Sequence, residues 1–229
     1  MSTYVLVHGA FVGGWIWRKT AKLMSANGHE VFTPTLTGMG ERIHLVNRDI
    51  GLETYLQDVI NLVKYEDLHN VILVGHSLGG MTITGVAGRI PERLAHVVYL
   101  DAALPESGQS FADLSGPENI ASTLPYVNAF DGYRLPPPPD APQSWDPQPV
   151  KPAVDPLVID HPDALALLPH TFIYCTADKS QPDPGNLPII RSAECARNDP
   201  RWNYIETANA HNIMLEDPEC TANLLMKVA

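Results

Sequence analysis

The segment Gly75–Gly79 reads Gly-His-Ser-Leu-Gly and fits the pattern G-x-S-x-G. It follows the apolar run Val71–Val74, which has the composition of a strand buried on both faces, and it precedes a segment that we expect to be helical. In such a strand–turn–helix unit the glycines permit a sharp turn, and the serine hydroxyl projects at the carboxyl edge of the sheet. We therefore expect Ser77 to be a nucleophile rather than only a residue that caps the following helix.

A serine hydroxyl is a weak nucleophile until a base removes its proton, and in this kind of unit the base is a histidine late in the chain. His211 lies in the loop Ala208–Asn212, between a late strand and the last helix, from which a side chain can reach back over the strand ends. The other histidines either precede Ser77 or lie in less favourable positions. We expect His211 to be the base.

The acid that orients this histidine should end a strand between the nucleophile and the base. Two aspartates do so: Asp101 directly follows the run Val97–Leu100, and Asp178 follows the run Phe172–Cys175. Sequence order does not decide between them, because both end strands. We choose Asp178, since Asp101 is followed by the run Ala102–Pro105, which more readily leads into an inserted cap.

A tetrahedral intermediate needs two N–H donors for its oxyanion. Leu78 follows the nucleophile and should supply one backbone N–H, while Ala10 or Phe11, in the turn after the first strand, should supply the other. Gly9 has no side chain and should leave room for the substrate carbonyl. The residues that we expect to contact an apolar or aromatic substrate are Gly9, Phe11, His76, Tyr126, Trp145 and Met214.

The rest of the chain alternates β-branched runs with segments whose apolar residues recur at helical spacing. This alternation predicts an α/β fold with a mostly parallel, doubly wound sheet. We expect strands within 4–7, 31–33, 71–74, 97–100, 172–175 and 202–206, and helices within 15–27, 53–66, 80–88, 186–197 and from 217 onward.

One stretch breaks the alternation. Residues 105–169 contain no clear strand–helix unit and include four consecutive prolines, Pro136–Pro139. Polyproline can neither continue a helix nor donate to a sheet. Long irregular segments between core elements are usually functional lids or disordered. We expect 105–169 to be an inserted Pro-rich cap on a core formed by 1–104 and 170–229.

The composition excludes several classes of function. Lys and Arg number 15 against 26 Asp and Glu, a formal net charge of −11, so a nucleic acid or an anionic membrane surface would be repelled. The three cysteines are not at CxxC spacing, and neither a metal site nor a cofactor is expected. Neither a signal peptide nor an apolar run of about 20 residues is evident, which favours a cytoplasmic location. The sequence is also compatible with a homodimer.

Several segments together resemble the α/β-hydrolase superfamily, and within it the branch that contains plant methylesterases and hydroxynitrile lyases. Besides the segments around Ser77 and His211, these are His8–Ala10 and Gly13–Trp15. Two more segments, Thr35–Arg42 and Tyr99–Ala102, are more similar to the bacterial esterases of that branch. The resemblance covers roughly residues 3–104 and 171–226, and it fades in the expected cap.

The resemblance has two implications for the site. In this branch the acid follows the strand that corresponds to Phe172–Cys175, and the Cys-Thr-x-Asp-Lys pattern at 175–179 supports Asp178 as the acid. The lyases carry Thr at the position of Gly9 and Lys after the catalytic histidine, where this chain has Asn212. Both departures favour hydrolysis over cyanohydrin cleavage.

Together these residues predict a serine hydrolase that acts on a small, apolar or aryl carboxylic ester. Ser77, His211 and Asp178 would form the catalytic triad, and the partner would be a small-molecule ester substrate. The alternatives are a carbamate, amide or lactone hydrolase with the same triad, a hydroxynitrile lyase, or a non-catalytic ligand receptor.

Overall fold

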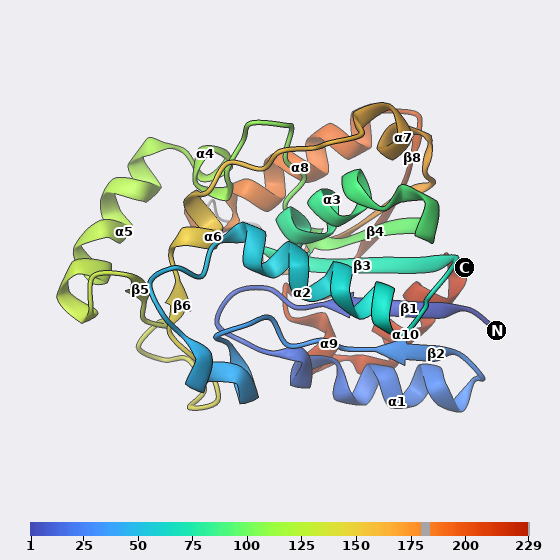
Figure 1. The fold of residues 1–229 in the computed structure, drawn as a ribbon, viewed down its shortest axis with the longest axis horizontal. Coiled ribbons are helices and arrows are strands. Elements are labelled where there is room, and N and C mark those ends of the chain that lie inside the picture. Colours follow the sequence, from blue (N-terminus) through green and yellow to red (C-terminus); the bar gives the residue numbers. More distant parts are fainter. Residues whose placement is uncertain (180–183, 229) are drawn as a thin grey trace.

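Six parallel strands form the central sheet of the structure, a computed structural model that describes residues 1–179 and 184–228 (Figure 1). The order across the sheet is β2-β1-β3-β4-β7-β8, and every neighbouring pair is parallel. The predicted α/β fold with a parallel sheet is confirmed. The strands are β1 (Thr3–Val7), β2 (Glu30–Phe32), β3 (Val71–Ser77), β4 (Leu94–Ala102), β7 (His170–Cys175) and β8 (Trp202–Thr207).

Helices cover both faces of this sheet (Figure 1). Alternate side chains of a strand point to opposite faces, so Val5 and Val7 of β1 join one core while Tyr4 and Leu6 join the other. The first core packs against α2 (Leu52–Tyr65), α3 (Gly79–Arg89) and α8 (Leu187–Asn198). The second packs against α1 (Arg18–Ala26), α9 (Ile213–Glu216) and α10 (Pro218–Lys227). Short 3-10 turns are η1 (Gly14–Trp17), η2 (Gly40–Leu45), η3 (Pro91–Arg93) and η4 (Pro184–Asn186).

The segment between β4 and β7 is more regular than the sequence led us to expect. It contains α4 (Phe111–Ser115), α5 (Pro117–Phe130), α6 (Lys151–Val154), α7 (Pro162–Leu167) and an antiparallel pair, β5 (Arg134–Leu135) with β6 (Gln148–Pro149). Three of these helices have only 5, 4 and 6 residues, too few to show a period, and α5 carries an interior proline, Pro125. Those features hid the helices from pattern analysis.

Hydrogen bonds fasten this segment to the turns at the carboxyl ends of the strands. Asp146 donates its backbone N–H to the Phe11 carbonyl at 2.7 Å, and its Oδ2 accepts the Gly40 N–H at 2.9 Å. Asp155 Oδ2 accepts the N–H of Leu52 at the start of α2 at 3.0 Å. In Figure 1, α4, α5, α6 and the β5–β6 pair lie beyond the strand ends. The division into a core and a cap at 105–169 stays a prediction.

Across the described ranges, 1–179 and 184–228, no helix combines the length and the apolar character that crossing a membrane requires.

Candidate active site

Ser77 is the last residue of β3 and stands at a sharp turn into α3. Its φ is 54°, in the left-handed region that residues other than glycine rarely adopt. The turn needs glycines because the chain passes close to itself: a Cβ on Gly75 would lie 2.9 Å from the Gly79 carbonyl oxygen, and one on Gly79 would lie 2.7 Å from the His8 carbonyl oxygen. The backbone therefore has the geometry of a nucleophile elbow.

His211 lies in the loop between β8 and α9, and it lines the same cavity as Ser77. Its Nδ1 lies 2.5 Å from Asp101 Oδ2. Because Nδ1 donates to this carboxylate, Nε2 is the nitrogen free to accept a proton. Among the described residues no hydrogen bond joins Ser77 Oγ to His211; in free enzymes this bond is often long and tightens once substrate binds.

The structure places Asp101, and not Asp178, against the imidazole of His211. Asp178 instead accepts the backbone N–H of His211 with its Oδ2, at 3.0 Å. The Asp178 side chain is 36% exposed, whereas that of Asp101 is fully buried. The geometry therefore differs from the expectation: the Asp178 carboxylate binds the backbone of the loop, while the Asp101 carboxylate binds the imidazole ring.

A β-bulge explains why Asp101 reaches the histidine. The register of β3 against β4 shifts, so that His76 pairs with Leu100 and Ser77 pairs with Ala102, which leaves Asp101 as an extra residue. Asp101 also has a φ of 45°. Bulges re-aim the side chain of the extra residue and are frequent beside active sites. The amino-acid pattern of β4 does not reveal this bulge, and so Asp101 could not be separated from Asp178 on sequence.

Three donors hold the Asp101 carboxylate. Its Oδ1 accepts the backbone N–H of Cys175 at 3.1 Å, and its Oδ2 accepts both the His211 Nδ1–H and the Lys179 ammonium, the latter at 2.9 Å. Burial alone would raise the pKa of Asp101, but the His211 hydrogen bond and the Lys179 charge outweigh it, and the pKa is lowered. Asp101 is therefore ionised at neutral pH and can stabilise a protonated His211.

Two further histidines support the turns around the serine. His76 Nε2–H donates to the His211 carbonyl at 2.9 Å, and the centres of the two rings are 4.4 Å apart. His8 Nδ1–H donates to the Gly9 carbonyl at 2.7 Å, and its Nε2 accepts the Leu36 N–H at 3.0 Å. Burial lowers the pKa of His76 well below its usual range and that of His8 to about 4. Both rings are therefore neutral structural supports at pH 7.

The structure separates the two candidates for the second oxyanion donor. The backbone N–H of Phe11 donates to Gln148 Oε1 at 3.2 Å and is therefore occupied. Within the described residues, the N–H groups of Ala10 and Leu78 have no hydrogen-bond partner, and both residues line the cavity. Leu78 also directly precedes α3, whose N-terminus favours negative charge. Ala10 and Leu78 are the pair that fits an oxyanion hole.

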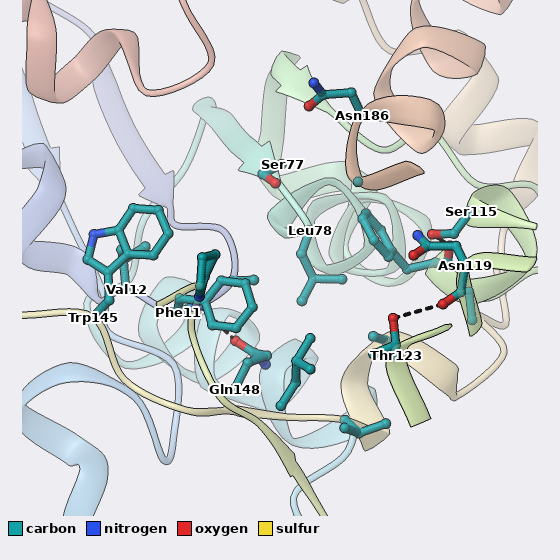
Figure 2. Close-up of a pocket in the computed structure, with 18 of the residues that line it drawn as sticks. Phe11, Val12, Ser77, Leu78, Ser115, Asn119, Thr123, Trp145, Gln148 and Asn186 are labelled. Carbon is teal, nitrogen blue, oxygen red and sulfur yellow. Dashed lines mark hydrogen bonds between the residues drawn. The ribbon is translucent and has the colours of Figure 1, made fainter. Parts of the chain in front are cut away.

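A cavity of about 900 Å³ lies beside Ser77 (Figure 2). This volume is within the range of small-molecule sites. Phe11 and Trp145 lie on one side, with ring centres 6.0 Å apart and planes within 7° of parallel. Asn119 and Thr123 of α5 lie on the opposite side, with Leu78 between (Figure 2). The expected cap segment therefore supplies much of the lining.

The electrostatic character of the lining is acidic. Two of the described lining residues, Asp140 and Asp178, carry carboxylates, and none of them is a lysine or an arginine. Within residues 1–179 and 184–228 we find no group of three or more His, Cys, Asp or Glu side chains that could hold a metal ion.

Three of the six residues expected to contact substrate line this cavity, namely Phe11, His76 and Trp145. Tyr126 is 65% exposed and Met214 is fully buried in the core, and neither lines it. Gly9 is not among the lining residues either, and a Cβ there would lie 2.7 Å from the Ser77 Cβ. The missing side chain makes room for the serine itself.

Sequence reasoning did not single out two residues of this site. Gln148 lies in a proline-rich stretch, and no local pattern marks it as a partner of Phe11. Lys179 did carry a signal, because it ends the Cys-Thr-x-Asp-Lys pattern. The pattern was used only to choose an aspartate, and the buried position of the lysine could not be seen from it.

The chain matches the model of the "Alpha/beta hydrolase family" over residues 4–221 and belongs to that family. It is 52% identical over 114 residues to a carbendazim hydrolyzing esterase of Nocardioides sp., covering 50% of this chain and 47% of that protein. It is 36% identical over 105 residues to salicylic acid-binding protein 2 of Nicotiana tabacum, covering 45% of this chain and 40% of that protein. The matched regions thus span less than half of either relative.

Solved structures extend the similarity to nearly the whole fold. An extracellular α/β-hydrolase from a Paenibacillus species superimposes with a TM-score of 0.85 at 25% identity, covering 99% of this chain and 98% of that one. A pyrethroid hydrolase from Sphingobium faniae superimposes with a TM-score of 0.74 at 20% identity, covering 99% and 96%. The second likeness concerns the fold alone. The predicted resemblance to the α/β-hydrolase branch of methylesterases and bacterial esterases is confirmed.

Proposed function

We propose that this protein is a serine hydrolase that cleaves an uncharged, largely apolar carboxylic ester through an acyl-enzyme. One observation carries the proposal: Asp101 holds Nδ1 of His211, and His211 shares a cavity with a serine in a nucleophile elbow. That combination supplies a nucleophile, a base and an orienting acid, which is what acyl transfer requires.

The steps follow from the positions of these groups. His211 Nε2 takes the proton of Ser77 Oγ while Oγ attacks the substrate carbonyl carbon, and the N–H groups of Ala10 and Leu78 stabilise the oxyanion. His211 then protonates the leaving alcohol oxygen as the C–O bond breaks, leaving an acyl group on Ser77. A water molecule, deprotonated by His211, attacks this acyl group, and the carboxylic acid departs as Ser77 regains its proton.

The lining of the cavity supports an uncharged substrate. Phe11 and Trp145 offer flat apolar surface, which suits an aryl or other planar group. The Asp140 carboxylate, and the net negative charge of the Asp101, Asp178 and Lys179 cluster, would oppose a substrate that carries a free carboxylate of its own. The same charges would favour release of the acid product.

A carbamate is the second candidate substrate class. The 52% identical relative is named for hydrolysis of carbendazim, a carbamate, and a carbamate carbonyl can be attacked in the same way. Amides and lactones remain alternatives with the same three residues. A hydroxynitrile lyase is disfavoured, since this chain has Gly9 and Asn212 where the lyases carry Thr and Lys, and a Cβ at Gly9 would lie 2.7 Å from the Ser77 Cβ. A non-catalytic receptor is disfavoured by the intact pairing of Asp101 with His211.

The proposal is tested with a panel of neutral aryl and alkyl esters, carbendazim, amides and lactones. We expect wild-type protein to hydrolyse at least one neutral ester and Ser77→Ala to lose about a million-fold in kcat, as in related triads. A phosphonate probe should label Ser77 in the wild type. Ser25→Ala, on the exposed surface of α1, serves as the matched control and should keep full activity. A Ser77→Ala protein that kept a tenth of the rate would overturn the serine mechanism.

A further inference from the structure

We propose that Lys179 is a positioning residue for His211, because its ammonium group bridges the two carboxylates that hold this histidine and sets the net charge around it. The expected effect on hydrolysis rests on the proposed function, whereas the expected effect on the protonation of His211 does not.

The geometry of the bridge is direct. Lys179 Nζ lies 2.9 Å from Asp101 Oδ2 and 2.7 Å from Asp178 Oδ1. The Lys179 side chain is only 4% exposed. Its Nζ also lies 6.0 Å from the centre of the Tyr174 ring. An ammonium group is costly to bury unless it is paired, so a buried lysine between two carboxylates acts as part of their cluster rather than as a surface charge.

The two carboxylates reach His211 by different routes. Asp101 accepts the imidazole Nδ1–H, and Asp178 accepts the backbone N–H of the same residue at 3.0 Å. Lys179 is therefore bonded to both the group that orients the ring and the group that orients its backbone. Loss of this one ammonium would remove a hydrogen-bond donor and a positive charge from both carboxylates at once.

The bridge also fixes the charge that faces the imidazole. The charged groups around it are Asp101 at the end of β4, and Asp178 and Lys179 after β7, while His76 on β3 is neutral. Two negative charges and one positive charge give a net charge of −1, which one protonated imidazole balances. Without the ammonium, a net charge of −2 would favour the protonated ring more strongly and would occupy the base with a proton up to a higher pH.

The protonation states support this count. Burial alone would lower the pKa of Lys179, but Asp101 and Asp178 outweigh it and the pKa is raised. Burial alone would raise the pKa of Asp178, but the Lys179 ammonium and the His211 N–H outweigh it and the pKa is lowered. All three groups therefore stay charged across the range in which an imidazole ordinarily titrates, near pH 6.5.

The test follows the titration of the His211 ring by NMR, which needs no catalytic activity. The His211 signal is assigned by its absence from His211→Gln. We expect Lys179→Met, which keeps the length of the side chain but not its charge, to raise the His211 titration midpoint by about one pH unit, the low end for a neighbouring charge. Lys179→Arg keeps the charge and should leave the midpoint near that of the wild type.

A charge-restoring pair makes the test sharper. Asp178→Asn alone should lower the midpoint, because it removes a negative charge while its amide oxygen can still accept the His211 N–H. The double variant Lys179→Met/Asp178→Asn should return the midpoint toward the wild-type value. Once an ester substrate is found, the pH at which kcat/KM falls on the acid side should shift in the same direction as each midpoint.

The outcomes separate the two proposals. A midpoint that Lys179→Met leaves unmoved, with only a lower thermal unfolding temperature, would show that the lysine is merely structural and would overturn the inference. If Lys179→Met does not fold, an unmoved midpoint in Asp178→Asn would overturn it equally. Shifted midpoints in a protein that hydrolyses nothing would support the bridge while the proposed function fails.

Discussion

Three residues of the site hold backbone conformations that side chains rarely adopt. Phe11, Ser77 and Asp101 have φ values of 66°, 54° and 45°. Each such conformation costs about 1–3 kcal/mol and persists only where surrounding contacts impose it. These residues lie in the turn after β1, at the proposed nucleophile and at the carboxylate that contacts His211, so the strain coincides with the groups that the proposed chemistry needs.

The clearest prediction at this scale separates the two aspartates. Asp101→Asn keeps the size of the side chain but favours the wrong imidazole tautomer, and we expect a loss of about ten-thousand-fold in kcat. Asp178→Asn should lower kcat far less when measured at alkaline pH, because Asp178 binds the backbone N–H of His211 and not its ring. Steady-state kinetics on one ester decide the matter. A dead Asp178→Asn together with an active Asp101→Asn would return the role of acid to Asp178.

At the scale of elements, the pattern of apolar residues predicted the strands of the sheet. It did not predict a helix with an interior proline or a change of register between two strands. Apolar and β-branched runs identified the six strands of the sheet, most clearly β3, because parallel strands buried on both faces are continuously apolar. The same reasoning missed α5 and the bulge at Asp101. A bulge is a change of register between two strands, and neither strand records it in its own residue pattern.

One element-scale prediction concerns β6 and the oxyanion turn. Gln148 Oε1 accepts the Phe11 N–H, and its Nε2–H groups donate to the Tyr55 hydroxyl and the Pro149 carbonyl, both at 3.1 Å. Gln148→Leu removes the acceptor and should loosen the turn that carries the Ala10 N–H. We expect kcat to fall by about ten- to a hundred-fold, less than the loss of an oxyanion donor itself, with a smaller change in KM.

Tyr55→Phe is the matched control for this variant. It removes one partner of Gln148 but leaves the bond to Phe11 in place. Its kcat should stay within a few-fold of the wild type. Equal losses in both variants would mean that Gln148 supports the cavity wall generally rather than the oxyanion turn.

For the whole molecule, the site is assembled from segments that lie far apart in the chain. Ser77 and His211 could be paired from the sequence because a nucleophile elbow requires a late histidine. Gln148 and Lys179 could not, because their roles depend on contacts across 137 and 78 residues that no local pattern encodes. The proposed nucleophile and base were thus more predictable than the residues that hold them.

Buried neutral histidines make the stability of the whole fold depend on pH. Burial lowers the pKa of His8 to about 4, from 6.5 in an unfolded chain, so protons bind the unfolded chain more readily. The stability from neutral His8 is therefore complete above pH 6.5 and is lost as the pH falls toward about 4, a loss of about 3 kcal/mol. His76 and His170, whose pKa values burial also lowers, act in the same direction.

Acid should therefore begin to destabilise the protein before its carboxylates titrate. Asp101 has a lowered pKa, so its contribution is lost only at pH values below the usual 3.8 of a carboxyl. We expect the free energy of unfolding in urea to decline steadily from pH 6.5 to pH 4.5. His8→Gln can keep an acceptor for the Leu36 N–H but cannot titrate, and it should flatten this decline, whereas the exposed His44→Gln should not. Equal slopes in the wild type and His8→Gln would show that the decline originates elsewhere in the fold.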